Sequence, residues 1–252
     1  MVEPPLTDGD QSIDSHRQVP PIAFAHRGDR AHALENTIDS FQMAIAKGAS
    51  GLESDVWVTA DGIAVLDHDG IVASRLRKKP ISEHNRNELP SHIPSLGDLY
   101  ASVGRHAHLS LDLKDHAALE PVLATARAAS AVDKLWLCSP NWEFLAANRG
   151  NAHDVRLVDS TRLKRLKDGP ERHAARLAHA GIDAINMHHT DWTTGLIALF
   201  HRFDLTCFGW DAQYERVIAD LIRMEIDGFF CDDTARMMAV LANRDQPGTT
   251  PP

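Results

Sequence analysis

The sequence predicts a single α/β domain whose strands close into a (β/α)₈ barrel, the TIM-barrel fold. Short apolar runs alternate with longer amphipathic segments along the chain, which is the pattern of a parallel sheet covered by helices. The chain has 252 residues, and about 250 is typical of this barrel. No linker divides the chain, and the sequence shows no internal repeat.

Nine runs are candidate strands because they are apolar or alternate with a period of two. They lie at Ile22–His26, Gly51–Val58, Ile63–His68, His108–Leu113, Leu135–Ser139, Val155–Ser160, Asp183–His188, Leu205–Trp210 and Gly228–Cys231. The segments between them repeat apolar residues at three- and four-residue spacing, as at Ile38, Phe41 and Ile45, and are candidate helices. They lie at Glu35–Lys47, His116–Ala131, Glu171–His179, Thr193–Arg202, Tyr214–Met224 and Thr234–Asn243.

Nine strands are one too many for the barrel, and the second and third are very close in sequence. Only four residues separate Val58 from Ile63, whereas a crossover between parallel strands needs roughly a dozen. Asp61-Gly62 is a strong signal for a two-residue hairpin turn. We therefore expect a β-hairpin that departs from the barrel pattern between Val58 and Ile63.

The hairpin also predicts where His68 lies. If Asp61-Gly62 forms the loop, His68 opposes Asp55, and if the loop shifts back by one residue, His68 opposes Glu53. Directly opposed residues on antiparallel strands share a face of the sheet. Either register therefore places His68 beside the carboxylates of the second strand.

The composition is that of an ordinary globular protein, with 43% hydrophobic and 24% charged residues. The formal net charge of −9 argues against nucleic acid as the main partner, because proteins that bind it usually present a basic face. The three cysteines lie far apart in apolar runs, so we expect buried thiols in a reducing compartment, the cytoplasm. No apolar run approaches the roughly 18 residues that span a bilayer, and we expect no stable membrane insertion. The sequence leaves the oligomeric state open.

Both ends of the chain differ from the middle. We expect residues 1–20 to form a disordered lead, because they are acidic, contain proline and lack the basic and apolar regions of a signal peptide. Residues 244–252 are expected to form a disordered tail. The barrel domain is therefore predicted over residues 21–243.

Three carboxylates are expected at the carboxyl ends of the barrel strands, where catalytic groups of this fold gather. Glu53 and Asp55 lie two apart on one strand and share a face, and Asp112 lies near the end of the strand His108–Leu113. They would repel one another unless one were protonated or a cation lay between them. Oxygen ligands suit a hard divalent cation, so we expect Ca²⁺ or Mg²⁺ here.

Basic and aromatic side chains are expected around the same point. Arg27 follows the first strand and Lys114 follows Asp112 by two residues; both would hold phosphate oxygens. His26 and His68 would act as general base and general acid, because imidazole exchanges protons near neutral pH. We expect Trp210 to wall the substrate pocket, with a buried barrel tryptophan as the alternative. The grouping predicts hydrolysis or transfer at a phosphate ester.

At these residues the sequence resembles the glycerophosphodiester phosphodiesterase family of phospholipase-C-like TIM barrels. The ordered combination of motifs is specific, although each alone would be weak. The matching segments are AHRG (25–28), LENTIDSFQMAIAKGASGLESDVWVTADGIAVLDHD (34–69), IPSL (93–96), LDLK (111–114) and IDGFFCDD (226–233). The resemblance runs from about Ile22 to Met238.

The resemblance implies metal-dependent hydrolysis of a small-molecule glycerophosphodiester to glycerol 3-phosphate and an alcohol. It assigns His26 and His68 as the acid/base pair, Glu53 and Asp55 as metal ligands, and Arg27 and Lys114 as phosphate contacts. Asp112 stands where the family usually carries Glu, and Gly70 stands where a proline often follows His-Asp. Further candidates to face the pocket are Glu35, Asn186, His188 and His189.

Two other classes of function stay open. A lipid-acting phosphodiesterase on the same barrel, of the lysophospholipase D or phospholipase C type, would call for an apolar membrane-binding loop, and no exposed aromatic cluster is evident between the strands. A non-catalytic barrel kept for binding predicts the loss of at least one of His26, His68, Glu53 or Asp55, and all four are present. The alcohol leaving group is not set by the sequence.

Overall fold

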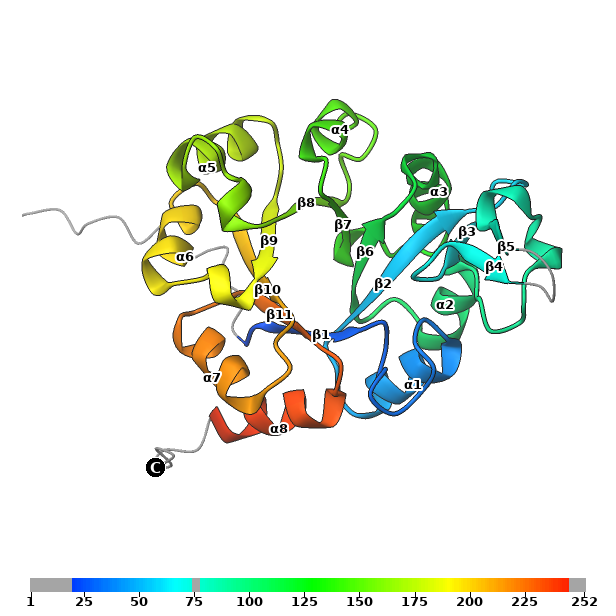
Figure 1. Cartoon of the computed structure of the whole chain (residues 1–252), viewed down its shortest axis with the longest axis horizontal. Coiled ribbons are helices and arrows are strands. Elements are labelled where there is room, and N and C mark those ends of the chain that lie inside the picture. Colours follow the sequence, from blue (N-terminus) through cyan, green and yellow to red (C-terminus); the bar gives the residue numbers. More distant parts are fainter. Residues whose placement is uncertain (1–19, 74–77, 245–252) are drawn as a thin grey trace, which may run out of the picture.

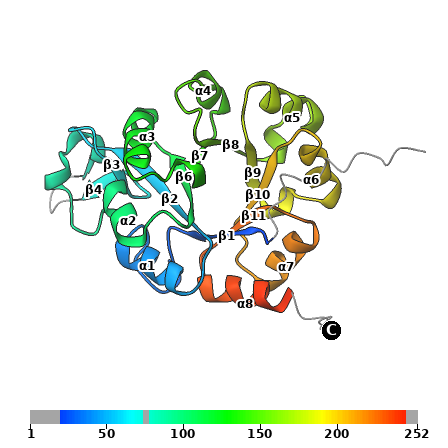
Figure 2. The same cartoon turned by 180° about the vertical axis from the view of Figure 1, so that it is seen from behind.

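The computed structural model describes residues 20–73 and 78–244, so the predicted lead, except Pro20, and the predicted tail, except Arg244, lie outside the described residues. Eight strands form a closed parallel barrel with helices around its outside (Figure 1, and from behind in Figure 2). In order around the ring they are β1 (Ile22–His26), β2 (Gly51–Val58), β6 (His108–Leu113), β7 (Leu135–Ser139), β8 (Arg156–Thr161), β9 (Ala184–His188), β10 (Thr206–Trp210) and β11 (Gly228–Cys231). Pairing of β11 with β1 closes the ring and confirms the predicted TIM barrel.

The helices fill the connections between the barrel strands. The α-helices are α1 (Ile38–Ala46), α2 (Leu96–Val103), α3 (Leu119–Ala128), α4 (Trp142–Ala147), α5 (Pro170–His179), α6 (Thr194–His201), α7 (Glu215–Arg223) and α8 (Thr234–Arg244). Short 3₁₀ turns lie at η1 (Ile81–Glu83), η2 (Arg86–Glu88), η3 (His116–Ala118), η4 (Val132–Lys134), η5 (Leu163–Arg165) and η6 (His189–Asp191). α2 and α4 lie outside the helical segments named from the sequence.

The first helix begins later than predicted because of its capping residues. The Ser40 backbone N–H donates to the Thr37 hydroxyl at 3.3 Å, and the Ser40 hydroxyl accepts from the Thr37 backbone N–H at 3.3 Å. This reciprocal capping box fixes the start of α1 at Ile38 instead of Glu35. Glu35 is thereby left in the loop after β1.

The predicted hairpin is present, between β2 and the short strand β3 (Ala64–Leu66), with Val56 opposite Leu66 and Val58 opposite Ala64. β6 pairs with one edge of β2 as far as Val56, and β1 pairs with the other edge only as far as Glu53. β3 therefore pairs with the second edge of β2, beyond the end of β1. Beyond β3 lies a two-stranded sheet of β4 (Ile71–Ala73) and β5 (Lys78–Pro80).

Both registers predicted for the hairpin are wrong by one residue. The backbone N–H of Asp67 donates to the Asp55 carbonyl at 3.1 Å, so Asp67 opposes Asp55 and His68 comes level with neither carboxylate. The loop is three residues long because the Thr59 hydroxyl accepts from the Ile63 N–H at 2.9 Å and donates to the Asp61 carboxylate at 2.6 Å. A shift of one residue exchanges the faces of a strand.

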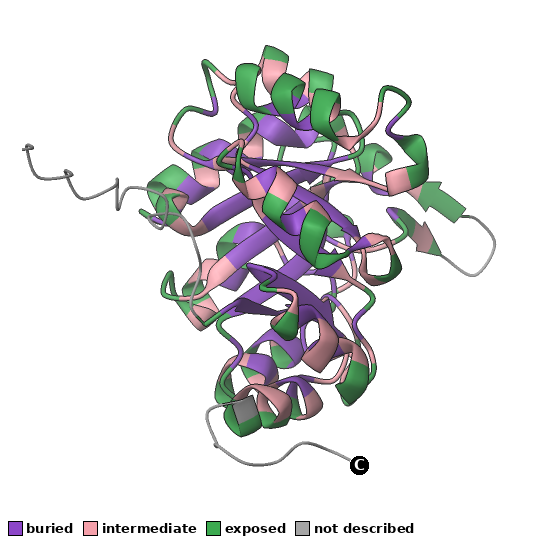
Figure 3. Cartoon of the chain, turned by 90° about the vertical axis from the view of Figure 1, so that its left-hand side faces the viewer, coloured by how far each residue is buried: buried purple, intermediate pink, exposed green. Residues whose placement is uncertain are grey.

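A layer of apolar side chains fills the barrel interior, and a larger core lies between the strands and the helices. In Figure 3 the ribbon in the middle of the molecule is mostly coloured as buried. The interior layer consists of Ile22, Phe24, Trp136, Cys138, Val158, Ala184, Phe208 and Phe230. Phe24 stacks on Phe230 with ring centroids 4.7 Å apart, and Trp136 meets Phe208 edge-on at 4.8 Å. Burying each aromatic ring contributes roughly 1.5–3 kcal/mol. This layer makes the barrel floor.

The floor positions the site above it. Strand side chains alternate between faces, so residues two places beyond a floor residue also face the barrel interior, nearer the carboxyl ends of the strands. His26 follows Phe24 in this way, Ser160 follows Val158, and Asn186 follows Ala184. The three cysteines are buried free thiols, as expected.

Candidate active site

A cavity of about 450 Å³ opens at the carboxyl ends of the barrel strands. It is lined by His26, Arg27, Glu53, Asp112, Ser160, Asn186, Trp210, Asp211, Gln213 and Phe230. The alternation of strand side chains above the apolar floor accounts for most of this list. The sequence-predicted His26, Arg27, Glu53, Asp112 and Trp210 therefore face one space.

The three carboxylates of Glu53, Asp55 and Asp112 lie together. One oxygen of each lies within 4.8 Å of the others. Burial, together with the neighbouring charges of Asp55 and Asp112, outweighs the opposing effect of His26 and raises the pKa of Glu53 to about 8. Burial likewise raises the pKa of Asp112. Three carboxylates this close repel one another when all are ionised. Their oxygens are the ligands that a hard divalent cation prefers.

Lys114 is held by two of these carboxylates. Its ammonium lies 2.8 Å from Asp55 Oδ1 and 3.4 Å from Asp112 Oδ2. Burial alone would lower the pKa of Lys114, but the charges of Asp112 and Asp55 outweigh it and raise the pKa. The side chain is therefore charged at the edge of the cluster.

Arg27 is positioned by a tight loop after β1. Its backbone is left-handed, with φ of 54°, and an added Cβ at the following Gly28 would collide with Ser40 of α1. The Arg27 backbone N–H donates to Glu53 Oε2 at 3.0 Å. Its guanidinium donates to Glu35 Oε1 at 3.0 Å, and its Nε lies 3.2 Å from Asp55 Oδ2. Glu35 thus reaches the site through Arg27.

His26 is oriented by Asp232, a residue that the sequence analysis gave no role. The His26 Nδ1 lies 2.6 Å from Asp232 Oδ1, and its Nε2 lies 3.7 Å from Glu53 Oε2. Burial would lower the pKa of His26, but Glu53 and the hydrogen bond to Asp232 outweigh it, so the pKa stands above its ordinary value. A carboxylate accepts only, so Nδ1 carries the proton and Nε2 is the atom that faces Glu53.

The signal for Asp232 lies in the barrel register. Ala25 pairs with Cys231 across the closing strands, so Asp232 comes level with His26 although 206 residues separate them. Asp232 also follows the floor residue Phe230 by two positions.

Asn36 supports the carboxylate of Asp55 from the loop before α1. Its Nδ2 donates to Asp55 Oδ2 at 3.3 Å, while its Oδ1 accepts from the Ser54 hydroxyl at 2.7 Å. The second bond fixes the orientation of the Asn36 amide. Asn36 therefore links the loop before α1 to Ser54 and Asp55 of β2.

His68 is not brought into contact with the carboxylates. Its Nδ1 lies 2.7 Å from Asp69 Oδ1, the side chain is 41% exposed, and His68 does not line the cavity in the described part of the chain. The preceding Asp67 lies opposite Asp55 on the part of β2 that extends past the end of β1. Trp57 Nε1 donates to the Asp67 carbonyl at 2.9 Å. His68 thus lies on a loop beside the mouth of the barrel.

The wall across the barrel from the carboxylates is polar and aromatic. Trp210 lines the cavity, with the guanidinium of Arg162 5.5 Å from its ring centroid. Asn186 is buried, and its Oδ1 has no hydrogen-bond partner among the described residues. An unpaired buried amide oxygen that lines a cavity can accept from a bound hydroxyl group.

A TIM barrel with ionisable groups gathered at the carboxyl ends of its strands has the layout of the enzymes built on this fold. The model of the Glycerophosphoryl diester phosphodiesterase family matches residues 26–236, and the chain belongs to this family. No helix among the described residues has the length and apolar character needed to cross a bilayer.

Individual relatives agree with the family assignment. The chain is 36% identical to glycerophosphodiester phosphodiesterase 1 of Bos taurus over 113 residues, which is 38% of this chain and 34% of the bovine protein. The match thus spans about a third of that relative. The solved glycerophosphodiester phosphodiesterase of Thermotoga maritima superposes with a TM-score of 0.76 at 21% identity, covering 87% of this chain and 98% of the other.

A second solved structure carries a bound product. A phosphodiesterase of Oleispira antarctica, in complex with sn-glycerol-3-phosphate, superposes with a TM-score of 0.77 at 20% identity. The superposition covers 88% of this chain and 97% of that one. At this identity the likeness shows a shared fold.

Proposed function

We propose that the chain hydrolyses glycerophosphodiesters to glycerol 3-phosphate and an alcohol with the help of a divalent cation. One observation carries the proposal: the carboxylates of Glu53, Asp55 and Asp112 cluster beside the His26–Asp232 pair in a cavity at the barrel mouth. This combination supplies a cation site and a proton-transfer group at the same place. Membership of the family supports the substrate class.

Glu53, Asp55 and Asp112 would hold the cation, Ca²⁺ or Mg²⁺. Bound there, the ion would neutralise charge on the carboxylates and on a phosphodiester. Arg27 and Lys114 would bind the non-bridging phosphate oxygens, the first through its planar guanidinium and the second as a point charge. The Arg27 Nε and the Lys114 Nζ lie 3.2 and 2.8 Å from the carboxylate oxygens of Asp55. Small movements of the two side-chain ends would bring them to a phosphate in the cavity.

His26 would exchange a proton with the substrate through Nε2. Asp232 fixes the imidazole at Nδ1 and stabilises its protonated form, which leaves Nε2 free to accept or donate. His68 would serve as the partner acid or base, with its exposed side chain turning from Asp69 toward the cavity. Contacts between catalytic groups are often loose before substrate binds.

The cavity volume suits a small substrate. About 450 Å³ lies within the range of roughly 300–1,000 Å³ for small-molecule sites. Trp210 and the unpaired Oδ1 of Asn186 would contact the part of the diester that extends from the phosphate. The lipid-acting alternative stays a prediction.

The test is release of glycerol 3-phosphate from soluble diesters, and of choline from lysophosphatidylcholine, by the purified protein. The substrates are glycerophosphocholine, glycerophosphoethanolamine and lysophosphatidylcholine, each with Mg²⁺, with Ca²⁺ and with chelator. We expect metal-dependent release from the soluble diesters, lost in Glu53→Gln and retained in the exposed control His92→Ala. Turnover of the lysolipid alone would favour the lipid-acting alternative, and no turnover of any diester with metal supplied would refute the proposal.

A further inference from the structure

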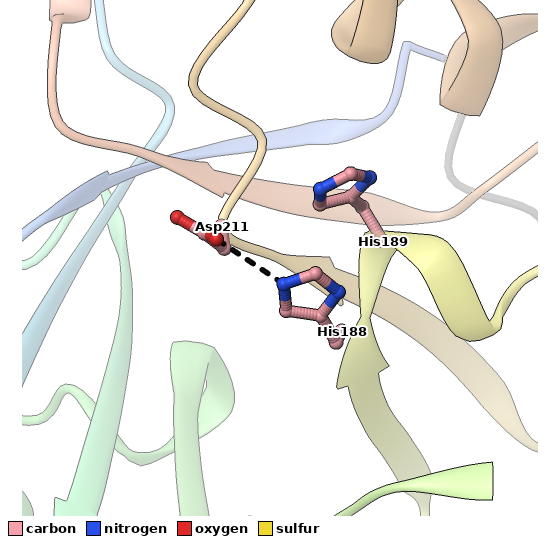
Figure 4. Close-up of side chains that lie close together, drawn as sticks. All are labelled: His188, His189 and Asp211. Atoms are coloured by element: carbon pink, nitrogen blue, oxygen red, sulfur yellow. Dashed lines mark hydrogen bonds and ion pairs between the residues drawn. The ribbon is translucent and has the colours of Figure 1, made fainter.

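We propose that His188, His189 and Asp211 form a second metal site, which takes a divalent transition cation of the Zn²⁺ class. One donor atom of each residue lies within 4.8 Å of the others (Figure 4). The cluster lies at the carboxyl ends of β9 and β10, which stand across the ring from β2 and β6 and their carboxylates. The two sites are therefore separate.

The strand register brings the three residues together. His188 ends β9 and pairs with Trp210, which ends the neighbouring parallel strand β10. His189 and Asp211 are the next residues along the two strands. Parallel strands end on the same side of a barrel, so these residues converge at its mouth, and Asp211 also lines the cavity.

The imidazole of His188 is already oriented for a ligand. Its Nδ1 lies 2.7 Å from the Thr190 hydroxyl, and its ring meets Trp210 edge-on with centroids 4.5 Å apart. The Thr190 backbone N–H donates to this Nδ1 at 3.2 Å, so Nε2 carries the proton and donates to Asp211 Oδ2 at 3.1 Å. A cation bound between Nε2 and Oδ2 would take the place of this proton, because histidine binds a metal through an unprotonated nitrogen.

The distances suit a small coordination sphere. Zinc bonds of roughly 2.0–2.1 Å at tetrahedral angles place neighbouring donors about 3.3 Å apart. The 3.1 Å between His188 Nε2 and Asp211 Oδ2 is close to this value. His189 lies beside them, with its ring centroid 4.4 Å from that of His188, and would complete the set through a side-chain rotation.

Donor chemistry separates this cluster from the carboxylates of Glu53, Asp55 and Asp112. Two imidazoles and one carboxylate favour Zn²⁺ and similar transition metals, whereas three carboxylates favour Mg²⁺ or Ca²⁺. The Asp211 side chain is 50% exposed, so the site is open to solvent and can keep a water ligand. A cation bound there would place a positive charge at the cavity wall that Asp211 forms.

The test is calorimetric titration of the full chain with Zn²⁺ in excess Mg²⁺, which occupies the carboxylate cluster. We expect one Zn²⁺ per chain and at least a roughly tenfold weaker affinity in His189→Ala and in Asp211→Asn. Glu53→Gln and the exposed His92→Ala should bind Zn²⁺ like the unaltered chain. X-ray absorption of the zinc-loaded protein should show imidazole scattering that weakens in His189→Ala.

Three results would overturn the proposal. They are the absence of Zn²⁺ binding, unchanged binding in both His189→Ala and Asp211→Asn, and loss of binding in Glu53→Gln. Circular dichroism of each variant confirms that it is folded. The titration needs no turnover, so its result is independent of the proposed hydrolysis.

Discussion

Replacing Asp232 by Asn tests how the site positions its histidine. The substitution keeps the shape of the side chain but removes the charge that accepts from His26 Nδ1 at 2.6 Å. A hydrogen bond to a charged group contributes roughly 1.5–3 kcal/mol. At 1.4 kcal/mol per factor of ten, we expect kcat to fall by roughly 10- to 150-fold.

The same variant should shift the pH profile. Asp232 is one of the groups that raise the pKa of His26, so Asp232→Asn lowers that pKa. The limb of the kcat profile that reports His26 then moves to lower pH, whether His26 acts as base or as acid. A merely structural role for Asp232 would lower activity without moving this limb.

The neighbouring Asp233 supplies a matched control. Asp233 Oδ1 accepts from the Arg236 backbone N–H at 3.0 Å in the first turn of α8. Asp233→Asn makes the same chemical change one residue away, and kcat should stay within about twofold, since it leaves the charge on His26 in place. The assay is steady-state release of glycerol 3-phosphate across pH 5–9. Unchanged kcat and pH profile in Asp232→Asn would refute the role assigned to Asp232.

Three further predictions concern the cation, the loop histidine and His108, which accepts a hydrogen bond from the floor residue Trp136. Glu53→Gln should abolish the rise in Tm that Ca²⁺ or Mg²⁺ produces, because it removes one of three clustered ligands; an unchanged rise would place the cation elsewhere. His68→Ala should reduce kcat by roughly 10²–10⁴ with Tm unchanged, and full activity would remove His68 from the mechanism. Burial, with Lys134 and Arg156 nearby, lowers the pKa of His108 to about 4. As the pH falls, His108 therefore binds a proton in the unfolded state at a higher pH than it does in the folded state. His108 should contribute roughly 1–2 kcal/mol of stability above pH ~6.5 that is lost toward pH ~4. His108→Gln, compared in urea at pH 7 and pH 5, should lose this pH dependence, and a variant that keeps it would contradict the assignment.

The barrel and much of its mouth could be predicted from the sequence because both follow from local patterns. The alternation of strands and helices predicted the fold. The spacing of two between Glu53 and Asp55, and between Asp112 and Lys114, predicted which side chains share a face. In the structure these four side chains do come together.

The hairpin register could not be read from the same pattern. Asp61-Gly62 predicted the position of the turn, but the Thr59 hydroxyl bonds to both Asp61 and Ile63 and the loop is one residue longer than predicted. Since strand faces alternate, that single residue decides whether His68 shares a face with the carboxylates. Side-chain bonds within a turn are not visible in hydrophobic spacing.

Asp232 was missed because its contact depends on closure of the ring. It meets His26 only when β11 pairs with β1, and no local spacing relates residues 206 positions apart. Asn186 and Trp210, which were predicted to face the pocket, do line the cavity, because each lies near the end of a barrel strand. The signal that could have found Asp232 is its place two residues beyond Phe230 in the barrel floor.

The most direct test of the proposed hydrolysis is phosphorus NMR of glycerophosphocholine with the purified protein and Mg²⁺ or Ca²⁺. The account predicts that the diester resonance is replaced by that of glycerol 3-phosphate, that chelator stops the conversion, and that restored metal resumes it. Appearance of phosphocholine instead, or conversion unaffected by chelator, would contradict it.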